Sequence, residues 1–190
     1  SNVVSQGMFA YCTHLSKITL PTGVTSIEKD AFEGCTSLRN IEIPANISML
    51  LPSSGCTALE TISVSKANVH YSSVDGVLLN ADATSIVWFP LGKKGDYTLP
   101  ATVNCIGDYA FKECNIEKFI LPDALTKIGQ GAFMNSNIKE VSLPDKLKSI
   151  PTGTFQGCKE LKIVRMGTKT ELISDYVFDN CPLTDIYIDA

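Results

Sequence analysis

Residues 138–158 read IKEVSLPDKLKSIPTGTFQGC, and the same apolar letters return in the same places along the chain. The stretch holds I-x-x-V-x-L-P, then L-x-x-I, and then a phenylalanine three residues before a cysteine. This last pair recurs as Phe9/Cys12, Phe32/Cys35, Phe111/Cys114, Phe133/Ser136, Phe155/Cys158 and Phe178/Cys181. Neighbouring copies lie 22 or 23 residues apart, with one long gap after Phe32. A fixed step of this length indicates a repeat protein.

Each repeat is predicted to contribute one short strand, because its I-x-L letters alternate apolar and polar residues. Pro144 and its equivalents end that strand, since proline has no N–H for a sheet hydrogen bond. The L-x-x-I and A-F-x-x-C segments have three-residue spacing and are predicted to form tight turns or short 3₁₀ segments. One repeat cannot bury its own apolar face, so like residues must stack on like.

We therefore predict a solenoid that is mainly β, a curved right-handed stack of about eight units of 22–23 residues. A parallel sheet about 35 Å wide would form its concave side, and short turns or 3₁₀ segments its convex side. The whole of residues 1–190 is expected to be a single domain. The chain opens at Ser1-Asn2, inside a repeat and without an initiating methionine, so we expect a fragment of a longer protein.

Residues 69–95 interrupt the frame. Asp75-Gly76 lies there between two apolar runs, which is a strong signal for a β-hairpin. We interpret 69–95 as a variant unit that bears a hairpin. Either Ile86–Phe89 or Tyr97–Leu99 would then join the main sheet, and the sequence leaves both open. Trp88 is expected to pack under the hairpin.

Six of the seven cysteines occupy one repeat position, where Ser136 stands in once. Such a position favours a small, mostly apolar side chain, so we predict a ladder of buried free thiols. Disulfides are disfavoured because the Cβ vectors of stacked residues run parallel. Cys105 lies outside the ladder and is predicted to be the most reactive thiol. With His14 and His70 as the only histidines and no C-x-x-C pair, neither a metal nor a cofactor is expected.

Charge and motifs exclude several function classes. The net charge is −4, whereas nucleic-acid binding needs clustered Lys and Arg, so no nucleic-acid partner is expected. No apolar run approaches the roughly 20 residues that span a bilayer, so no transmembrane segment is predicted. No phosphate-binding loop, nucleophile elbow or zinc-protease motif is present, and the chain is predicted not to be an enzyme.

The combined I-x-L-P, V-x-x-I and A-F-x-x-C frame, with the V-D-G-V-L-L…W-F-P segment, resembles the BspA-like leucine-rich repeat proteins. The resemblance covers essentially all 190 residues. It implies an α/β-type leucine-rich repeat fold and a location at the surface of a bacterium or in its secretions. It also implies adhesion to host extracellular or surface proteins. Commoner leucine-rich repeats carry a buried asparagine ladder, which this chain lacks.

A concave sheet would expose the residue between the two buried strand positions as a column. This candidate binding face comprises Thr19, Glu42, Ser63, Ile120, Ser142, Arg165 and Tyr187, with Lys118 in the neighbouring column and Trp88 or Thr98 in the ambiguous unit. Exposed Tyr, Arg and apolar residues suit a protein interface. For Lys118 and Glu140, the alternative is a cross-strand pair that keeps the sheet soluble.

The leading hypothesis is a non-enzymatic module that binds or adheres to a protein ligand through this face. The alternatives are a structural spacer in a multidomain surface protein and a carbohydrate-binding module, which would need exposed aromatic platforms. Both ends are expected to expose apolar residues, at Met8-Phe9 and Ile186–Ile188. Such edges predict either a longer repeat array or end-to-end self-association.

Overall fold

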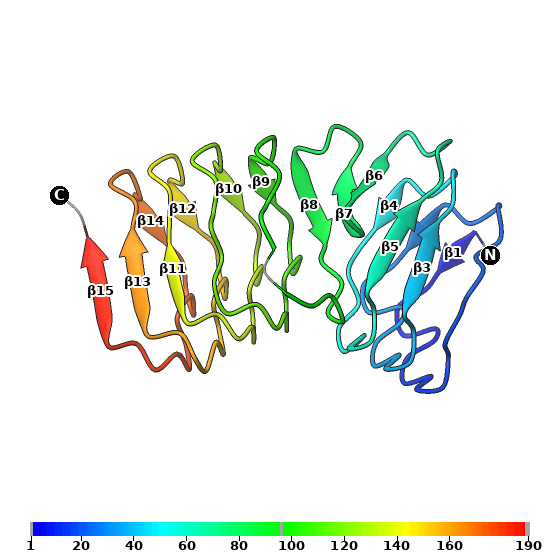
Figure 1. Cartoon of the computed structure of the whole chain (residues 1–190), viewed down its shortest axis with the longest axis horizontal. Helices are drawn as coiled ribbons and strands as arrows, with labels where there is room; N and C mark the ends of the chain where they lie inside the picture. Colours follow the sequence, from blue (N-terminus) through cyan, green and yellow to red (C-terminus); the bar gives the residue numbers. More distant parts are fainter. Residues whose placement is uncertain (1, 96, 189–190) are drawn as a thin grey trace. The chain divides into compact units, whose positions relative to one another are not determined.

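The structure is a computed structural model that describes residues 2–95 and 97–188. It divides into two compact units, which we call unit 1 (Ser1–Lys94) and unit 2 (Gly95–Ala190). Each unit is a β-solenoid built from successive repeats (Figure 1). In the described residues all regular elements are β-strands, and no helix occurs.

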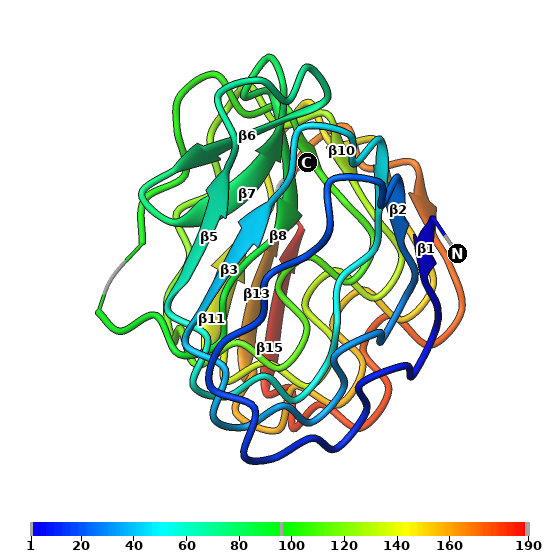
Figure 2. The ribbon, with the colours of Figure 1, turned by 90° about the vertical axis from the view of Figure 1, so that its right-hand side faces the viewer.

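Two segments of the repeat form short strands, although only some repeats form both. The I-x-L segments form what we call the long ladder, with β3 (Asn40–Ile43) and β5 (Thr61–Val64) in unit 1 and β11 (Glu140–Ser142), β13 (Ile163–Met166) and β15 (Asp185–Ile188) in unit 2. The V-x-x-I segments form the short ladder, with β1 (Val3–Val4), β2 (Ser26–Ile27) and β4 (Met49–Leu50) in unit 1 and β9 (Cys105–Ile106), β10 (Lys127–Ile128), β12 (Ser149–Ile150) and β14 (Leu172–Ile173) in unit 2. In unit 1, β1 and β2 lie on the opposite side of the coil from β3 and β5 (Figure 2).

Strands within each ladder are parallel and pair with the equivalent residue one repeat away. In the long ladder of unit 2, Val141 pairs with Val164, which pairs with Ile186. In the short ladder of unit 1, Ile27 lies between Val4 and Leu50. The repeats therefore stack like on like, which confirms the predicted solenoid.

The short ladder is the main difference from the sequence prediction. The V-x-x-I spacing predicts a turn, yet segments such as Ser26–Ile27 and Ser149–Ile150 pair as strands. Stacking already holds successive repeats at the distance of paired strands, so these backbones can bond to each other. Two residues are too few to show the alternation by which a strand is recognised. The A-F-x-x-C segments form turns, as predicted.

Phenylalanine rings run in files through the core of each unit. In unit 2 the ring of Phe133 stacks between Phe111 and Phe155, at centroid distances of 5.2 Å and 5.3 Å. Phe178 continues the file at 5.7 Å from Phe155. The rings are within 8° of parallel, and Phe119 meets Phe133 edge-on at 5.1 Å. Each ring thus fills the space between its two neighbours, as the sequence predicts.

The cysteines form the predicted ladder of free thiols. The thiols of Cys35, Cys56, Cys158 and Cys181 donate to the carbonyl oxygen of the phenylalanine one repeat earlier, at 3.2 Å from Cys56 to Phe32 and 3.0 Å from Cys158 to Phe133. Burial raises the pKa of Cys114 to about 12. The Cys114 thiol therefore stays protonated. The thiol-to-carbonyl bonds of the other ladder cysteines tie neighbouring turns together.

Two residues with positive φ flank the phenylalanine of each of the six F-x-x-C or F-x-x-S signatures, which the sequence did not reveal. The residues two before it are Gly7, Asp30, Tyr109, Gly131, Gly153 and Tyr176, and the residues two after it are Tyr11, Gly34, Glu113, Asn135, Gly157 and Asn180. Because residues with positive and negative φ alternate here, every second backbone N–H points along the stack. The N–H groups of Gly131, Phe133 and Asn135 thus donate to carbonyls of the next repeat. At Gly157 φ is +72° and an added Cβ would meet the Asn135 side chain, so another residue there would be strained.

Residues 69–95 contain the predicted hairpin. β6 (Tyr71–Val74) and β7 (Val77–Asn80) are antiparallel, and β8 (Ser85–Trp88) pairs with β7. Residues 97–99 form no strand, so the segment at 86–89 is the one that enters a sheet. Trp88 is only 2% exposed and packs in the core of unit 1, as expected.

Unit 1 ends its phenylalanine file differently from unit 2. Phe9 stacks on Phe32 at 5.5 Å, but the equivalent position in the next repeat is Ser53. The buried Ser53 hydroxyl accepts the N–H of Phe32 at 3.1 Å, the bond that a backbone carbonyl accepts in unit 2. This substitution explains why the signature is incomplete at Cys56.

Candidate protein-binding face

The strand face is the set of side chains of the I-x-L segments that point away from the core. In unit 1, Glu42 and Ser63 are opposite each other on β3 and β5, and both are exposed. The Ser63 hydroxyl donates to the carbonyl of Ile41 at 3.4 Å. Thr19 is also exposed but lies on a segment outside any strand.

In unit 2 the strand face holds three residues in exact register, Ser142, Arg165 and Tyr187 on β11, β13 and β15. All three are exposed. Ile120 precedes them on an irregular segment and is 67% exposed, which is unusual for so apolar a side chain. Lys118 is exposed and forms a single parallel bridge with Glu140.

Arg165 is held on this face by two side-chain contacts. Its guanidinium bonds to the Glu140 carboxylate at 3.2 Å and lies 4.5 Å from the centre of the Tyr187 ring. Glu140 thus pairs with Arg165, one repeat forward, in place of the Lys118 pair that the sequence suggests. Since Arg165 is still 44% exposed, it can contact a partner without losing these contacts. An arginine fixed over a tyrosine loses little side-chain entropy on binding.

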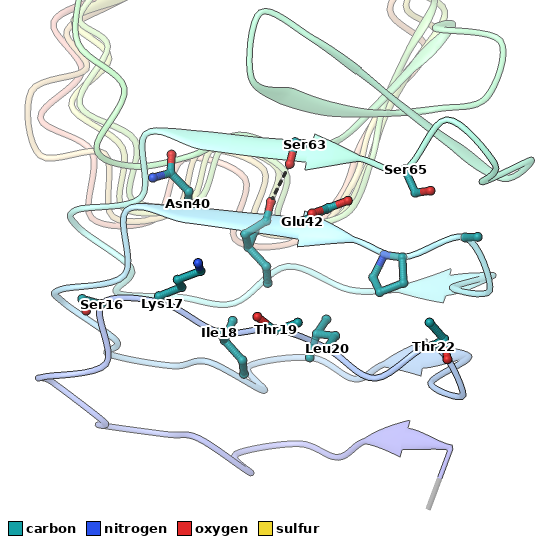
Figure 3. Close-up of a pocket in the computed structure, with 13 residues that line it drawn as sticks. Ser16, Lys17, Ile18, Thr19, Leu20, Thr22, Asn40, Glu42, Ser63 and Ser65 are labelled. Atoms are coloured by element: carbon teal, nitrogen blue, oxygen red, sulfur yellow. Dashed lines mark hydrogen bonds between the residues drawn. The ribbon is translucent and has the colours of Figure 1, made fainter.

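A groove marks the strand face of unit 1, with a volume of 710 Å³. It runs between the segment 16–22 and β3, and it is lined by Ser16, Lys17, Ile18, Thr19, Leu20, Thr22, Asn40, Ile41, Glu42, Pro44, Ala45, Ser63 and Ser65 (Figure 3). Hydroxyl, amide, ammonium and carboxylate groups all line it. This groove could not be predicted from the sequence, because it arises from the spacing of two repeats and from no single residue.

Two candidates for the ambiguous unit do not extend the strand face. Trp88 is buried, so its ring is not available to a ligand. Thr98 is exposed but lies outside any strand. Of the aromatic residues that the sequence proposes for this face, Tyr187 is therefore the exposed one.

The described residues hold little that could do chemistry. His14 contacts the hydroxyl of Thr13 at 3.3 Å. Within 2–95 and 97–188, no three His, Cys, Asp or Glu side chains converge as a metal site would need. Cys105 is half-buried and Cys12 is exposed, so we now expect Cys12 to react first. The same residues include no helix of the length and apolarity that would cross a bilayer.

The predicted apolar ends are exposed at Met8 and at residues 186–188, whereas Phe9 is half-buried and stacks on Phe32. Met8 is 49% exposed, and Ile186 and Ile188 on β15 are 50% and 75% exposed. In the interior repeats the equivalent positions, such as Val164, are buried. The outer edge of β15 therefore has the apolar character of a surface on which another repeat could stack.

The sequence matches the BspA type leucine rich repeat region in six copies, over residues 2–75 and 93–190. The chain belongs to the BspA-type leucine-rich repeat family. Repeat modules of this family are generally structural or binding proteins, and nothing in the described residues indicates catalysis. No curated protein matches the chain.

Solved structures of similar repeat proteins come from bacteria. A leucine rich cell surface protein of Faecalibacterium prausnitzii is 28% identical, with a TM-score of 0.76 over 99% of this chain and 57% of that one. A leucine-rich repeat protein from Eubacterium ventriosum (22% identity, TM-score 0.69, covering 98% of this chain and 70% of that one) shares the fold. The pneumococcal vaccine antigen PcpA also shares the fold, with 20% identity and a TM-score of 0.64 over 87% of this chain and 56% of that one. This BspA-type chain thus spans little more than half of the Faecalibacterium protein.

Proposed function

We propose that this BspA-type repeat chain is a non-enzymatic module that binds a protein ligand through its strand face. In this proposal it is part of a bacterial protein that is secreted or held at the cell surface, and units 1 and 2 act as one domain. The ligand is an extracellular or surface protein of the host. The similarity to a cell surface protein of Faecalibacterium prausnitzii supports the location.

The observation that carries the proposal is the Arg165–Tyr187 pair. Tyr and Arg are the residues that most often dominate protein interfaces, and here they are in contact, exposed and held in register by β13 and β15. Ile120 adds an exposed apolar side chain to the same unit. Mixed polar neighbours such as Ser142 resemble the rim of an interface.

The two alternatives receive less support. A carbohydrate-binding module would need several exposed aromatic platforms. Trp88 is buried, so Tyr187 is the one exposed aromatic residue among the candidates for the strand face. A structural spacer has no need of an exposed, pre-ordered arginine. The fold by itself would serve a spacer equally well, so the binding test decides between them.

Capture of host extracellular-matrix proteins by the immobilised chain tests the proposal. The double variant Arg165→Glu/Tyr187→Ala should weaken capture roughly 100-fold, because two interface anchors are lost. The matched control is Lys148→Glu/Leu172→Ala, which makes the same kinds of change on an exposed residue next to β12 and on an exposed residue of β14. Unchanged capture by the first variant, or equal loss in the control, would place the ligand elsewhere.

A further inference from the structure

The groove of unit 1 is an opening between two successive repeats. Lys17–Leu20 corresponds in the repeat frame to Asn40–Ile43, which is β3, and should pair with it. Within residues 2–95, no hydrogen bond joins these two segments. At the next junction the bonds are present, since the Glu60 N–H donates to the Arg39 carbonyl at 2.8 Å.

The same two repeats remain joined on the other side of the coil. Ile27 on β2 pairs with Leu50 on β4, and the Ser53 hydroxyl accepts the N–H of Phe32. The repeats are therefore fixed at the short ladder and separated at the strand face. The groove is therefore a place where one pair of strands is missing from the long ladder, while the neighbouring strand pairs β3–β5 and β2–β4 are formed.

Both walls of this gap present unpaired backbone. The Arg39 carbonyl accepts bonds from Glu60 and Thr61, and the Ile43 carbonyl accepts one from Ser65, at the two ends of β5. Strand alternation therefore turns the N–H and C=O of Asn40 and Glu42 toward the groove. On the other wall, the described structure gives no partner to the backbone of Ile18. Unpaired strand edges are templates for another extended chain.

The size of the groove fits a short strand. An extended residue occupies about 160 Å³, given a rise of about 3.3 Å, a strand spacing of about 4.8 Å and a layer thickness of about 10 Å. The volume of 710 Å³ thus holds about four residues. This is also the length of β3. None of the thirteen lining residues is aromatic, which disfavours a sugar.

We infer that this groove binds an extended peptide segment of a protein partner, which completes the long ladder between Lys17–Leu20 and β3. This inference rests on the proposed role in protein binding but uses different contacts from Arg165 and Tyr187. The main chain of the peptide bonds to both walls, as in other cases of strand addition.

The walls also specify the peptide sequence. The first residue faces outward between Lys17 and Asn40, and the third between Thr19 and Glu42, so an acidic and a basic residue suit these positions. The second and fourth face inward beside Ile18 and Leu20, which are half-buried and buried. The preferred pattern is therefore acidic, apolar, basic, apolar.

The test uses the full 190-residue chain and a fluorescent peptide, TDIKIT, in an anisotropy titration. Saturable binding is expected, and Glu42→Lys should weaken it roughly fivefold because one attraction becomes a repulsion. The peptide TDIEIT should bind Glu42→Lys better than wild type. The matched control Glu171→Lys, the same change at an exposed glutamate of unit 2 outside the strand face, should leave binding of TDIKIT unchanged. N-methylation of the first isoleucine removes the N–H that donates to Asn40 and should weaken binding at least tenfold.

Hydrogen exchange tests the gap itself without relying on affinity. The amides of Asn40 and Glu42 should exchange fast in the free chain and become protected when TDIKIT is bound. Protection in the free chain would mean that Lys17–Leu20 pairs with β3, and would overturn the inference. So would the absence of saturable binding, or equal binding of the N-methylated peptide. If matrix capture depends on Arg165 and Tyr187 while TDIKIT fails to bind, the inference falls and the proposed function stands.

Discussion

Replacing Phe133 by alanine should destabilise unit 2 far more than the same change at the end of the file. Phe133 is fully buried and contacts Phe111, Phe155 and Phe119. Truncation of a buried phenylalanine costs about 3–5 kcal/mol, and the loss of three ring contacts places Phe133→Ala near the upper end, at about 4–5 kcal/mol. The half-buried Phe178 contacts one ring, so Phe178→Ala should cost about 1–2 kcal/mol.

Urea unfolding followed by circular dichroism gives the free energy of unfolding of both variants. Because Phe133→Ala could leave unit 2 unfolded at the start, Phe133→Leu serves as a second variant with an expected loss of about 1–1.5 kcal/mol. Equal losses for Phe133→Ala and Phe178→Ala would refute the reasoning, because they would mean that the inner ring has no more neighbours than the outer one.

Three further predictions concern single residues. Gly157→Ala should destabilise unit 2 by about 1–3 kcal/mol in the same urea assay, because φ is +72° and the added Cβ clashes; no loss would argue against this geometry. At pH 8, iodoacetamide should label the exposed Cys12 and spare Cys114, as mass spectrometry of the native chain can check; rapid labelling of Cys114 would contradict its burial. Hydrogen bonds from Thr168 lower the pKa of Asp145, so its contribution to stability is present above the unfolded pKa of about 3.9 and is lost as pH falls through the folded value. The stability difference between wild type and Asp145→Ala should therefore shrink below about pH 4, and a difference that grows there would refute this.

The repeat frame could be predicted from the sequence because its residues are repeated and buried. Phe133 and Cys158 recur at fixed steps, and a recurring apolar letter in a repeat protein has one physical role, which is to stack on its own kind. The hairpin was also predictable, since Asp75-Gly76 is a turn signal that acts locally.

Other features are fixed by the stack and leave no common letter in the sequence. The position two residues after each phenylalanine needs positive φ, yet it holds residues as different as Tyr11, Glu113 and Gly157. The short ladder depends on two-residue strands such as Ser149–Ile150, which show no periodicity. In both cases the backbone geometry is imposed by hydrogen bonds to the next repeat.

The candidate site was predictable as a column but not in its details. Register places Ser142, Arg165 and Tyr187 in line, as the repeat frame requires. The choice of Arg165 as partner for Glu140 depends on side-chain reach across the sheet, and the groove beside Glu42 depends on where two repeats separate. Neither is encoded in a local pattern.

Nuclear Overhauser contacts between phenylalanine ring protons test the stacking of repeats most directly. The account predicts contacts between Phe111 and Phe133, between Phe133 and Phe155, and between Phe155 and Phe178, with none between Phe111 and Phe178. A spectrum without Overhauser contacts between neighbouring rings, or with a contact between Phe111 and Phe178, would contradict the in-register stack. Every other conclusion follows from that stack.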